Sequence, residues 1–177
     1  MKSLQVNGFG DPPVLCDIAR PDPLPGEVTI RIRACGLNFA DLLLMKGRYQ
    51  EQPAAPFTLG MEFSGEIASL GMHVTGLRQG DRVAVYSGHG GLAQYASVPA
   101  TRCVPMPHSM TFEQAAAFQV AYGTSHLALA HKARLLAGET LLVLGAAGGV
   151  GRTAVELGER MGARVIACAR GPEKLAI

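Results

Sequence analysis

The sequence predicts a mixed fold, in which a β-rich first half is followed by the first βαβ unit of a doubly wound α/β sheet. Two observations support this fold class. Residues 1–108 contain all but one of the eleven prolines, with glycine turns between short alternating runs. Residues 141–158, LLVLGAAGGVGRTAVELG, then join an aliphatic run to a helical pattern through four glycines, which is the order strand, turn and helix.

Alternation of apolar and polar residues marks the strands of the first half. Residues 28–33, VTIRIR, alternate strictly and predict a half-buried antiparallel strand. Residues 62–70, 82–86 and 92–98 predict further strands, because glycine turns separate them. Together these segments predict a compact β-barrel or β-sandwich.

A helical stretch follows these strands. Thr111, with Gln114 three residues later, has the pattern of a capping box and opens the stretch. It runs with breaks to about Leu136, and Gly138 ends it. The aliphatic residues 141–144 then predict a parallel strand that is buried on both faces.

A second helix and a second strand complete the βαβ unit. Apolar residues recur at helical spacing between Val150 and Met161, and Gly162 stands where a C-terminal cap belongs. Residues 164–168 predict the second strand. A doubly wound sheet needs about five or six strands. We therefore expect the chain to be part of a longer protein, and residues 1–177 alone to be inactive.

The glycine turn before the second helix is a candidate phosphate site. It reads Ala146-x-Gly148-x-x-Gly151, a departure from G-x-G-x-x-G, with Gly149 as an additional glycine. Gly148 would let the backbone approach a pyrophosphate, and Gly151 would allow close packing of helix on strand. The free N–H groups and the dipole at a helix N-terminus attract anions. The alternative is a glycine-rich turn without a ligand.

Composition and charge exclude several classes of function. The 177 residues carry a net charge of +2 without a dense run of Lys or Arg, which argues against a nucleic-acid partner. The four cysteines form no C-x-x-C pair, which argues against a disulfide framework and a cysteine zinc site. Since no segment has the pattern of a signal peptide or membrane span, we expect a cytoplasmic protein without a membrane partner.

Seven stretches, in order along the chain, resemble the zinc-free quinone oxidoreductase (zeta-crystallin-like) branch of the medium-chain dehydrogenase/reductase superfamily. They are MKSLQVNGFGDPPVL, GLNFADLLLMKGRY, PFTLGMEFSGEIASLG, GDRVAVY, GGLAQYASVP, AYGTSHLAL and GETLLVLGAAGGVG. The resemblance implies a GroES-like catalytic domain over residues 1–118 and an incomplete Rossmann nucleotide-binding domain over residues 119–177. It further implies a nicotinamide cofactor between the domains, and a homodimer for the full-length protein.

The resemblance also implies a reaction without zinc. Zinc-dependent relatives have a cysteine and a histidine ligand where this chain has Asn38 and Met61. An amide oxygen and a thioether are poor zinc ligands. The four-cysteine lobe of those relatives is missing as well, because a short glycine loop connects Tyr86 to Gly91. We therefore expect no metal site.

Four residues match positions that serve the substrate or cofactor in this family. The amide of Asn38 would donate a hydrogen bond to an acceptor carbonyl, and Tyr49 would bind the acceptor or cofactor or donate a proton. Asp41 matches an acidic position, and Thr124 matches a threonine near the nicotinamide. The alternatives are a turn residue at Asn38, an ordinary aromatic at Tyr49 and helix caps at Asp41 and Thr124.

The end of the second predicted strand favours NADPH over NADH. NAD-specific sites place Asp or Glu about 20 residues after the glycines, whereas this chain has Arg170 and then Lys174, with no acid before Glu173. Cations suit the 2′-phosphate of NADPH, although both residues are alternatively explained as solvated surface charges. The expected cofactor-binding residues are Thr124, Ala146, Gly148, Gly149, Val150, Gly151, Arg170 and Lys174.

The predicted function is that of an NADPH-dependent oxidoreductase, which passes hydride without zinc to a quinone or another α,β-unsaturated carbonyl compound. Asn38, Tyr49 and Asp41 are the expected catalytic residues. An enoyl-thioester reductase has the same fold and is one alternative. A non-catalytic nucleotide-binding or structural protein, as crystallin-like relatives imply, is the alternative from another class.

Overall fold

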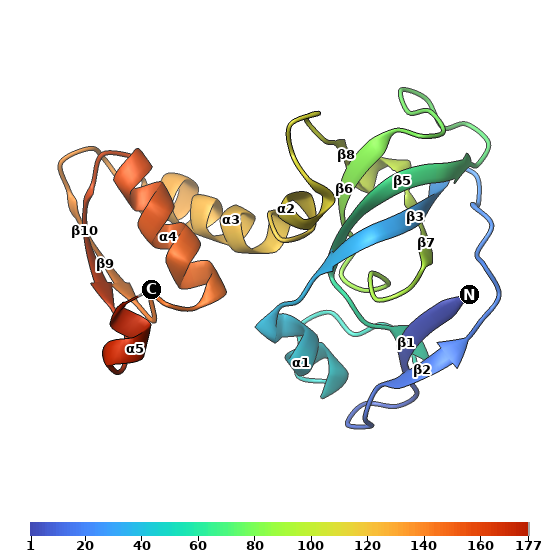
Figure 1. Cartoon of the computed structure of the whole chain (residues 1–177), viewed down its shortest axis with the longest axis horizontal. Coiled ribbons are helices and arrows are strands. Elements are labelled where there is room, and N and C mark those ends of the chain that lie inside the picture. The colour runs from blue at the N-terminus through green and yellow to red at the C-terminus, as the bar shows by residue number, and fades with distance from the viewer. Residues whose placement is uncertain (177) are drawn as a thin grey trace. The chain divides into compact units, whose positions relative to one another are not determined.

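The computed structural model describes residues 1–176 and divides into two compact units, one from Met1 to Gln119 and one beginning at Val120 (Figure 1). Each unit is described by itself. No helix within the described residues is long and apolar enough to cross a lipid bilayer.

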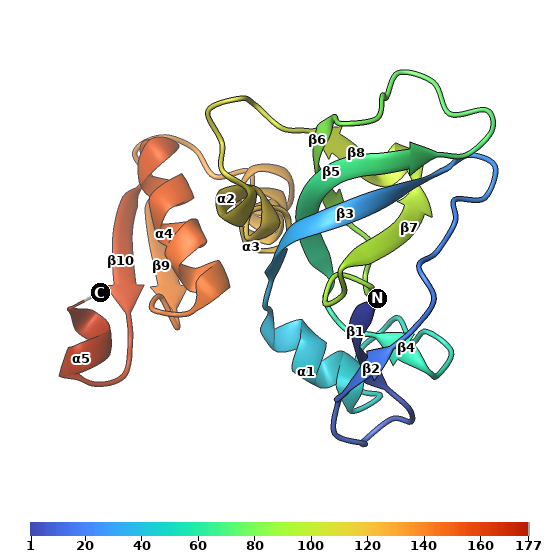
Figure 2. The ribbon, with the colours of Figure 1, turned by 45° about the vertical axis from the view of Figure 1, so that its right-hand side comes forward.

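The first unit contains two antiparallel sheets (Figure 2). The smaller sheet has the strand order β2-β1-β4, and the larger has the order β7-β3-β5-β6-β8. The strands are β1 (Lys2–Val6), β2 (Val14–Asp17), β3 (Glu27–Gly36), β4 (Phe57–Thr58), β5 (Glu62–Leu70), β6 (Arg82–Tyr86), β7 (Tyr95–Pro99) and β8 (Cys103–Pro105). Three short helices accompany them: α1 (Phe39–Met45), η1 (Ala100–Arg102) and α2 (Phe112–Ala116).

The strands predicted from alternation are confirmed, with two differences. The segments 62–70 and 82–86 coincide with β5 and β6, and 28–33 lies inside the longer β3. The predicted strand 92–98 begins too early, because β7 starts only at Tyr95, where it pairs with β3. The carbonyl of Leu92 instead accepts a hydrogen bond from the Leu4 amide (2.8 Å). Thr29 is fully buried although the pattern placed it outside, since its hydroxyl donates to the Pro21 carbonyl (3.1 Å).

Two apolar clusters form the core of the first unit. The first lies within the larger sheet and consists of Val28, Ile30, Phe63, Ile67, Val83, Val85, Ala96 and Val98. The second consists of Val6, Leu44, Phe57, Leu59 and Met61. Leu44 belongs to α1, and its burial in the second cluster fixes that helix to the unit. The residue before α1 is Asn38, so the core also fixes the position of this side chain.

The capping box predicted at the start of the helical stretch is confirmed. The Thr111 amide donates to Oε1 of Gln114 (3.0 Å), and the Gln114 amide donates to Oγ1 of Thr111 (3.2 Å). This box opens α2, whose Ala115 and Ala116 are buried.

The second unit contains the predicted βαβ arrangement. The strands β9 (Thr140–Leu144) and β10 (Arg164–Cys168) are parallel and in register from Thr140↔Arg164 to Cys168↔Leu144. The helices are α3 (Gln119–His126), η2 (Leu127–Ala133), α4 (Gly149–Arg160) and α5 (Pro172–Leu175). Gly162, with φ of +81°, follows the last turn of α4, which confirms its predicted place at the helix end.

The helical stretch ends earlier than expected. It stops at Ala133, before the predicted Leu136, because η2 is wound as a wider π-helix and Arg134 adopts a left-handed conformation with φ of +54°. The Leu135 amide then donates back to the Leu129 carbonyl (2.9 Å) and closes the helix end.

The expectation that residues 141–144 are buried on both faces is wrong for the described chain. Val143 is 8% exposed, whereas Leu142 is 57% and Leu144 is 76% exposed. The covered face lies under α4, where a Cβ on Gly158 would approach Cδ2 of Leu141 to 2.6 Å. Within residues 1–176, β9 and β10 pair only with each other, so the opposite face and both edges stay open.

We expect the open sheet to exchange its amide hydrogens quickly. In a polypeptide of residues 1–177, hydrogen exchange followed by mass spectrometry should be much faster in β9 and β10 than in β5, which has a hydrogen-bonded strand on each side. Equal protection of the two regions would show that another surface, such as a partner chain, covers the edges of β9 and β10.

Candidate active site

Asn38 stands between β3 and α1, and two carboxylates of the first unit bind it. Its backbone N–H donates to Oδ2 of Asp41 (2.8 Å), and its side-chain Nδ2 donates to Oε1 of Glu62 (2.9 Å). Asp41 is 6% exposed and Glu62 is 2% exposed. Asn38 is the N-cap residue of α1, and its side-chain amide is in addition held by a buried carboxylate.

Asp41 braces the start of α1. Besides the Asn38 amide, its carboxylate accepts a hydrogen bond from the Gly60 amide (3.2 Å), which ties the helix to the segment before β5. Burial raises the pKa of Asp41, while hydrogen bonds from backbone amides, including that of Met61, act in the opposite direction. The sequence left two roles open for Asp41, a catalytic group or a cap of the following helix. These contacts describe the second role, which makes Asp41 a positioning residue.

Glu62 was missed as a site residue by sequence reasoning. It lies on β5 opposite Gly36, and a Cβ on Gly36 would lie 2.7 Å from Oε1 of Glu62 and 2.3 Å from the Ala116 carbonyl. Only glycine therefore leaves room for the carboxylate. The available signal was a charged residue inside a buried strand, which is rare unless the charge has a partner.

Cys35 lies beside the two carboxylates and is expected to be unreactive. Burial, followed by the charges of Asp41 and Glu62, raises the pKa of its thiol from 9.0 to about 12. At pH 8 the reactive thiolate is then about a thousandfold rarer than in an unperturbed cysteine.

Alkylation by iodoacetamide, followed by peptide mass spectrometry, should therefore be far slower at Cys35 in native protein than in protein unfolded by urea. Burial raises the pKa of the Cys103 thiol to about 11. Alkylation of Cys103 should therefore also be slower in native than in unfolded protein, but by a smaller factor than at Cys35. Equal rates at Cys35 in native and unfolded protein would contradict this environment.

Tyr49 and Tyr86 both pack against the second apolar cluster, close enough for Tyr49 to raise the pKa of Tyr86. Burial, followed by the interactions with Tyr49, raises the pKa of Tyr86 to about 12, so Tyr86 stays protonated at neutral pH. The structure thus joins two phenols where sequence reasoning singled out Tyr49 alone. The signal was weak, because Tyr86 is the last residue of an ordinary strand.

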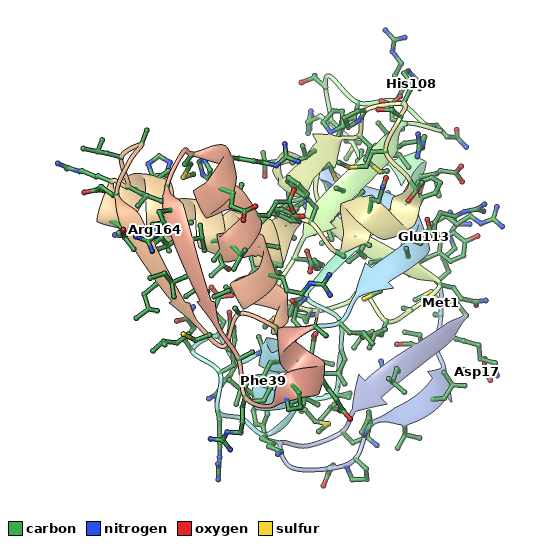
Figure 3. All side chains as sticks on the ribbon, turned by 60° about the vertical axis from the view of Figure 1, so that its left-hand side comes forward. Met1, Asp17, Phe39, His108, Glu113 and Arg164 are labelled. Atoms are coloured by element: carbon green, nitrogen blue, oxygen red, sulfur yellow. The ribbon has the colours of Figure 1, made fainter. Side chains whose placement is uncertain are left out.

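Exposed apolar residues flank Asn38 in the sequence and along α1. Leu37 is 76% exposed, Phe39 is 74% exposed and Leu42 is 50% exposed (Figure 3 labels Phe39). The first unit thus exposes aliphatic and aromatic side chains at the positions next to Asn38, a composition typical of sites that bind apolar ligands through a few polar groups.

The positions that carry zinc ligands in zinc-dependent relatives are used differently here. Met61 is 1% exposed and belongs to the second apolar cluster, and the amide of Asn38 is bonded to Glu62. Among residues 1–176, no group of three His, Cys, Asp or Glu side chains is arranged to hold a metal ion.

We expect purified protein to contain far less than one zinc ion per chain, because an amide and a buried thioether are poor ligands for it. Elemental analysis after dialysis measures this directly. Stoichiometric zinc would contradict the zinc-free interpretation.

The glycine turn of the second unit lies at the N-terminus of α4. Gly145 has φ of +71°, and Gly148 caps the helix. The Ala146 amide donates to the carbonyl of Cys168 (2.9 Å), which joins the turn to the end of β10. Arg170, two residues after Cys168, is therefore close in the fold to the glycine turn, as the parallel pairing of β9 and β10 requires.

The remaining predicted cofactor residues of this unit are mostly at its surface. Gly148, Gly149, Val150, Arg170 and Lys174 are exposed. Thr124 is exposed within α3 and caps no helix. Sequence reasoning missed its neighbour Ser125, whose hydroxyl is buried against that of Thr153 (2.8 Å) and joins α3 to α4.

Gly151 allows close packing as the motif predicts, but of α4 on the loop that follows β9 and not on the strand itself. A Cβ at this position would lie 2.2 Å from the Gly145 carbonyl oxygen and 2.8 Å from the Cα of Ala146. By contrast, a Cβ on Gly149 would meet nothing within 4 Å. The first turn of α4 therefore lies against the loop at Gly151 and opens to its surroundings at Gly149.

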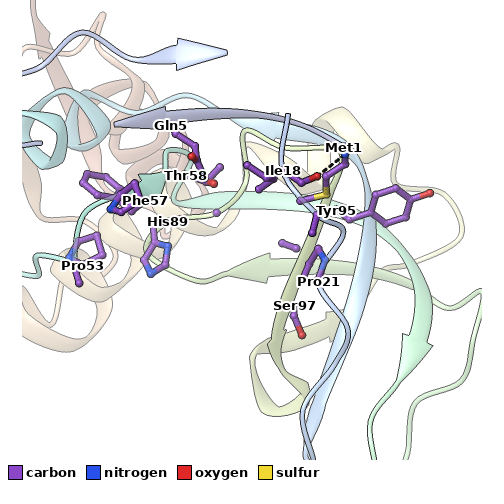
Figure 4. Close-up of a pocket in the computed structure, with 15 residues that line it drawn as sticks. Met1, Gln5, Ile18, Pro21, Pro53, Phe57, Thr58, His89, Tyr95 and Ser97 are labelled. Carbon is purple, nitrogen blue, oxygen red and sulfur yellow. Dashed lines mark hydrogen bonds between the residues drawn. The ribbon is translucent and has the colours of Figure 1, made fainter. Parts of the chain in front are cut away.

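A cavity of about 470 Å³ in the first unit contains none of the predicted site residues (Figure 4). Ile18, Pro21, Phe57 and Tyr95 give it an apolar wall, and His89 adds a polar group. Burial, followed by the charge of Arg102, lowers the pKa of His89 and so favours its neutral form.

Comparisons with known proteins agree with this architecture. Residues 24–108 match the alcohol dehydrogenase GroES-like domain. The chain is 41% identical to a quinone oxidoreductase-like protein 2 homolog of Nematostella vectensis, over 99% of this chain and 49% of that protein. It is 37% identical to the quinone oxidoreductase of Mus musculus, over 98% of this chain and 54% of that protein.

Two solved structures are similar as well. The quinone oxidoreductase of Thermus thermophilus, described also in complex with NADPH, is 38% identical with a TM-score of 0.87, over 98% of this chain and 55% of that chain. The CurK enoyl reductase is 31% identical with a TM-score of 0.88, over 99% of this chain and 55% of that chain. The chain spans about half the length of these relatives. The expected fold, a GroES-like domain followed by the first part of a Rossmann fold, is confirmed.

Proposed function

Because the chain belongs to the quinone oxidoreductase branch of the medium-chain dehydrogenase/reductase superfamily, we propose that the protein carrying it is an NADPH-dependent, zinc-independent oxidoreductase. Its acceptor would be a quinone or another α,β-unsaturated carbonyl compound. The observation that carries this proposal is the amide of Asn38, which is held by Glu62 and flanked in sequence by the exposed Leu37 and Phe39, at a position where zinc-dependent relatives have a metal ligand.

A bound reduced nicotinamide supplies the hydride, and an acceptor that is already electrophilic needs no metal to polarise it. The residues of the chain then bind and orient the acceptor. Asn38 offers a hydrogen bond to the acceptor carbonyl, and the apolar side chains of Leu37 and Phe39 suit a quinone ring. The hydroxyl of Tyr49, whose ring packs near Tyr86, is the candidate to bind the reduced acceptor or pass it a proton.

The second unit fits the phosphates of a dinucleotide. α4 has twelve residues and begins at the glycine turn, where exposed backbone at Gly148 and Gly149 leaves space for an anion. Arg170 is exposed beyond the end of β10, which Ala146 joins to this turn. A guanidinium at this place suits a 2′-phosphate, so we propose NADPH rather than NADH as the cofactor.

An enoyl-thioester reductase is the second candidate, which the similarity to the CurK enoyl reductase supports. The same donors would then bind the thioester carbonyl, and Tyr49 would donate the proton that follows hydride addition.

Oxidation of NADPH by the whole protein, measured first with a panel of quinones and then with crotonyl thioester, distinguishes the candidates. We expect turnover with quinones that falls strongly in an Asn38→Ala variant. Turnover with the thioester alone would support the second candidate, and no oxidation with any acceptor would favour a non-catalytic nucleotide-binding protein.

A further inference from the structure

We propose that Glu62 is a positioning residue, whose carboxylate fixes the amide of Asn38 in one of its two orientations. The consequence for turnover rests on the proposed function of Asn38. The hydrogen bond itself is tested below without any assay of activity.

The chemistry of the pair fixes the orientation. Nδ2 of Asn38 donates to Oε1 of Glu62 at 2.9 Å, and an accepting carboxylate oxygen selects the N–H side of the amide over its carbonyl side. Turning the amide over would bring Oδ1 against Oε1 and leave the buried carboxylate without this donor, which is unfavourable for a buried polar group. A glutamine at position 62 would lack this selectivity, because it offers both a donor and an acceptor.

The surroundings hold Glu62 in place. It is 2% exposed, its strand pairs with β3 at Gly36 and with β6 at Tyr86, and Gly36 has no side chain to displace the carboxylate. Asp41 holds the backbone of Asn38 separately. One carboxylate therefore positions the backbone of Asn38 and another positions its amide, which leaves the second Nδ2 hydrogen in a fixed direction for a ligand, while Oδ1 belongs to the capping box of α1.

An exchange of donor and acceptor tests the pair. In an Asn38→Asp variant, two carboxylates would face each other at the distance of a hydrogen bond, and they cannot both be ionised cheaply. They must share a proton that is held more tightly in the folded state than in the unfolded state. The free energy of unfolding of this variant is therefore highest at low pH, and it decreases as the pH rises through the raised pKa of the pair.

The melting temperature of Asn38→Asp in this chain should therefore fall from about pH 5 to pH 8 relative to wild type. Asp41 and Cys35 also face this pair, so a carboxylate at position 38 acts on them as well. The double variant described next keeps that carboxylate and removes only the one at Glu62, so the difference between the two variants isolates the contact with Glu62. Adding Glu62→Gln to Asn38→Asp restores a donor and an acceptor with reversed polarity, and should remove the additional pH dependence. If Asn38→Asp shows no more pH dependence than wild type, the contact is refuted.

If Asn38→Asp does not fold at any pH, the double variant decides. Its folding supports the pair, and its failure to fold overturns it.

The positioning role is tested by Glu62→Gln in the whole protein. We expect kcat to fall about tenfold or more, because small misplacements of a binding group are costly, with the melting temperature close to that of wild type. Glu66→Gln, on the same strand and 4.0 Å from Arg33, is the control and should leave kcat unchanged. A wild-type kcat for Glu62→Gln would overturn the positioning role. If wild type itself oxidises no NADPH, the proposed function fails, while the melting series still decides whether Glu62 holds Asn38.

Discussion

Replacing Arg170 with alanine in the whole protein is expected to weaken NADPH binding by about tenfold to more than a hundredfold, with little effect on NADH. A hydrogen bond between charged groups contributes on the order of 1.5–3 kcal/mol, and each 1.4 kcal/mol is about a factor of ten in affinity. NADH lacks the 2′-phosphate, so it should not lose this contact. Titration calorimetry or fluorescence with each cofactor measures the difference.

Arg160→Ala is the matched control for Arg170→Ala. Arg160 is also exposed, but it stands in the last turn of α4 and pairs with Glu156 (3.1 Å), away from the glycine turn at the other end of the helix. It should leave both affinities unchanged. If wild type binds NADH as tightly as NADPH, or if Arg170→Ala weakens both equally, the role given to Arg170 is wrong.

Replacing Gly151 with alanine is expected to destabilise the second unit by about 1–3 kcal/mol, although alanine is the better helix former. The added Cβ would lie 2.2 Å from the Gly145 carbonyl oxygen and 2.8 Å from the Cα of Ala146. Both are backbone atoms, so α4 or the loop must move. Thermal unfolding followed by circular dichroism measures the loss.

Gly149→Ala separates this contact from the general effect of removing a glycine. It lies in the same turn of α4, its Cβ would meet nothing within 4 Å, and it should be neutral or stabilising by about 0.4–1 kcal/mol. Equal destabilisation by both substitutions would show that loop flexibility, and not close packing at Gly151, explains the motif.

Local patterns predicted most of the fold, because they record interactions between near neighbours. The alternation in 62–70 and 82–86, the capping box at Thr111 and the cap at Gly162 all act within one turn or one strand. The exposure of Leu142 was not predicted, because burial depends on what covers the sheet and not on the strand itself.

The candidate site was predicted less completely than the fold. The glycine turn was found from its spacing, and Asn38 and Tyr49 were found from the resemblance. The neighbours of these two residues, Glu62 and Tyr86, come from strands far along the chain. Such contacts depend on strand register, which brings Glu62 opposite Gly36. Single-residue patterns do not encode that pairing, so the positioning of Asn38 emerged only from the structure.

The central claim, hydride transfer from NADPH without zinc, is tested most directly by a steady-state assay of the whole protein before and after dialysis against a chelator. Quinone-dependent oxidation of NADPH should proceed at the same rate in both preparations, and faster with NADPH than with NADH at low cofactor concentration. Loss of activity on chelation with recovery on addition of zinc, or no quinone-dependent oxidation in either preparation, would contradict the account.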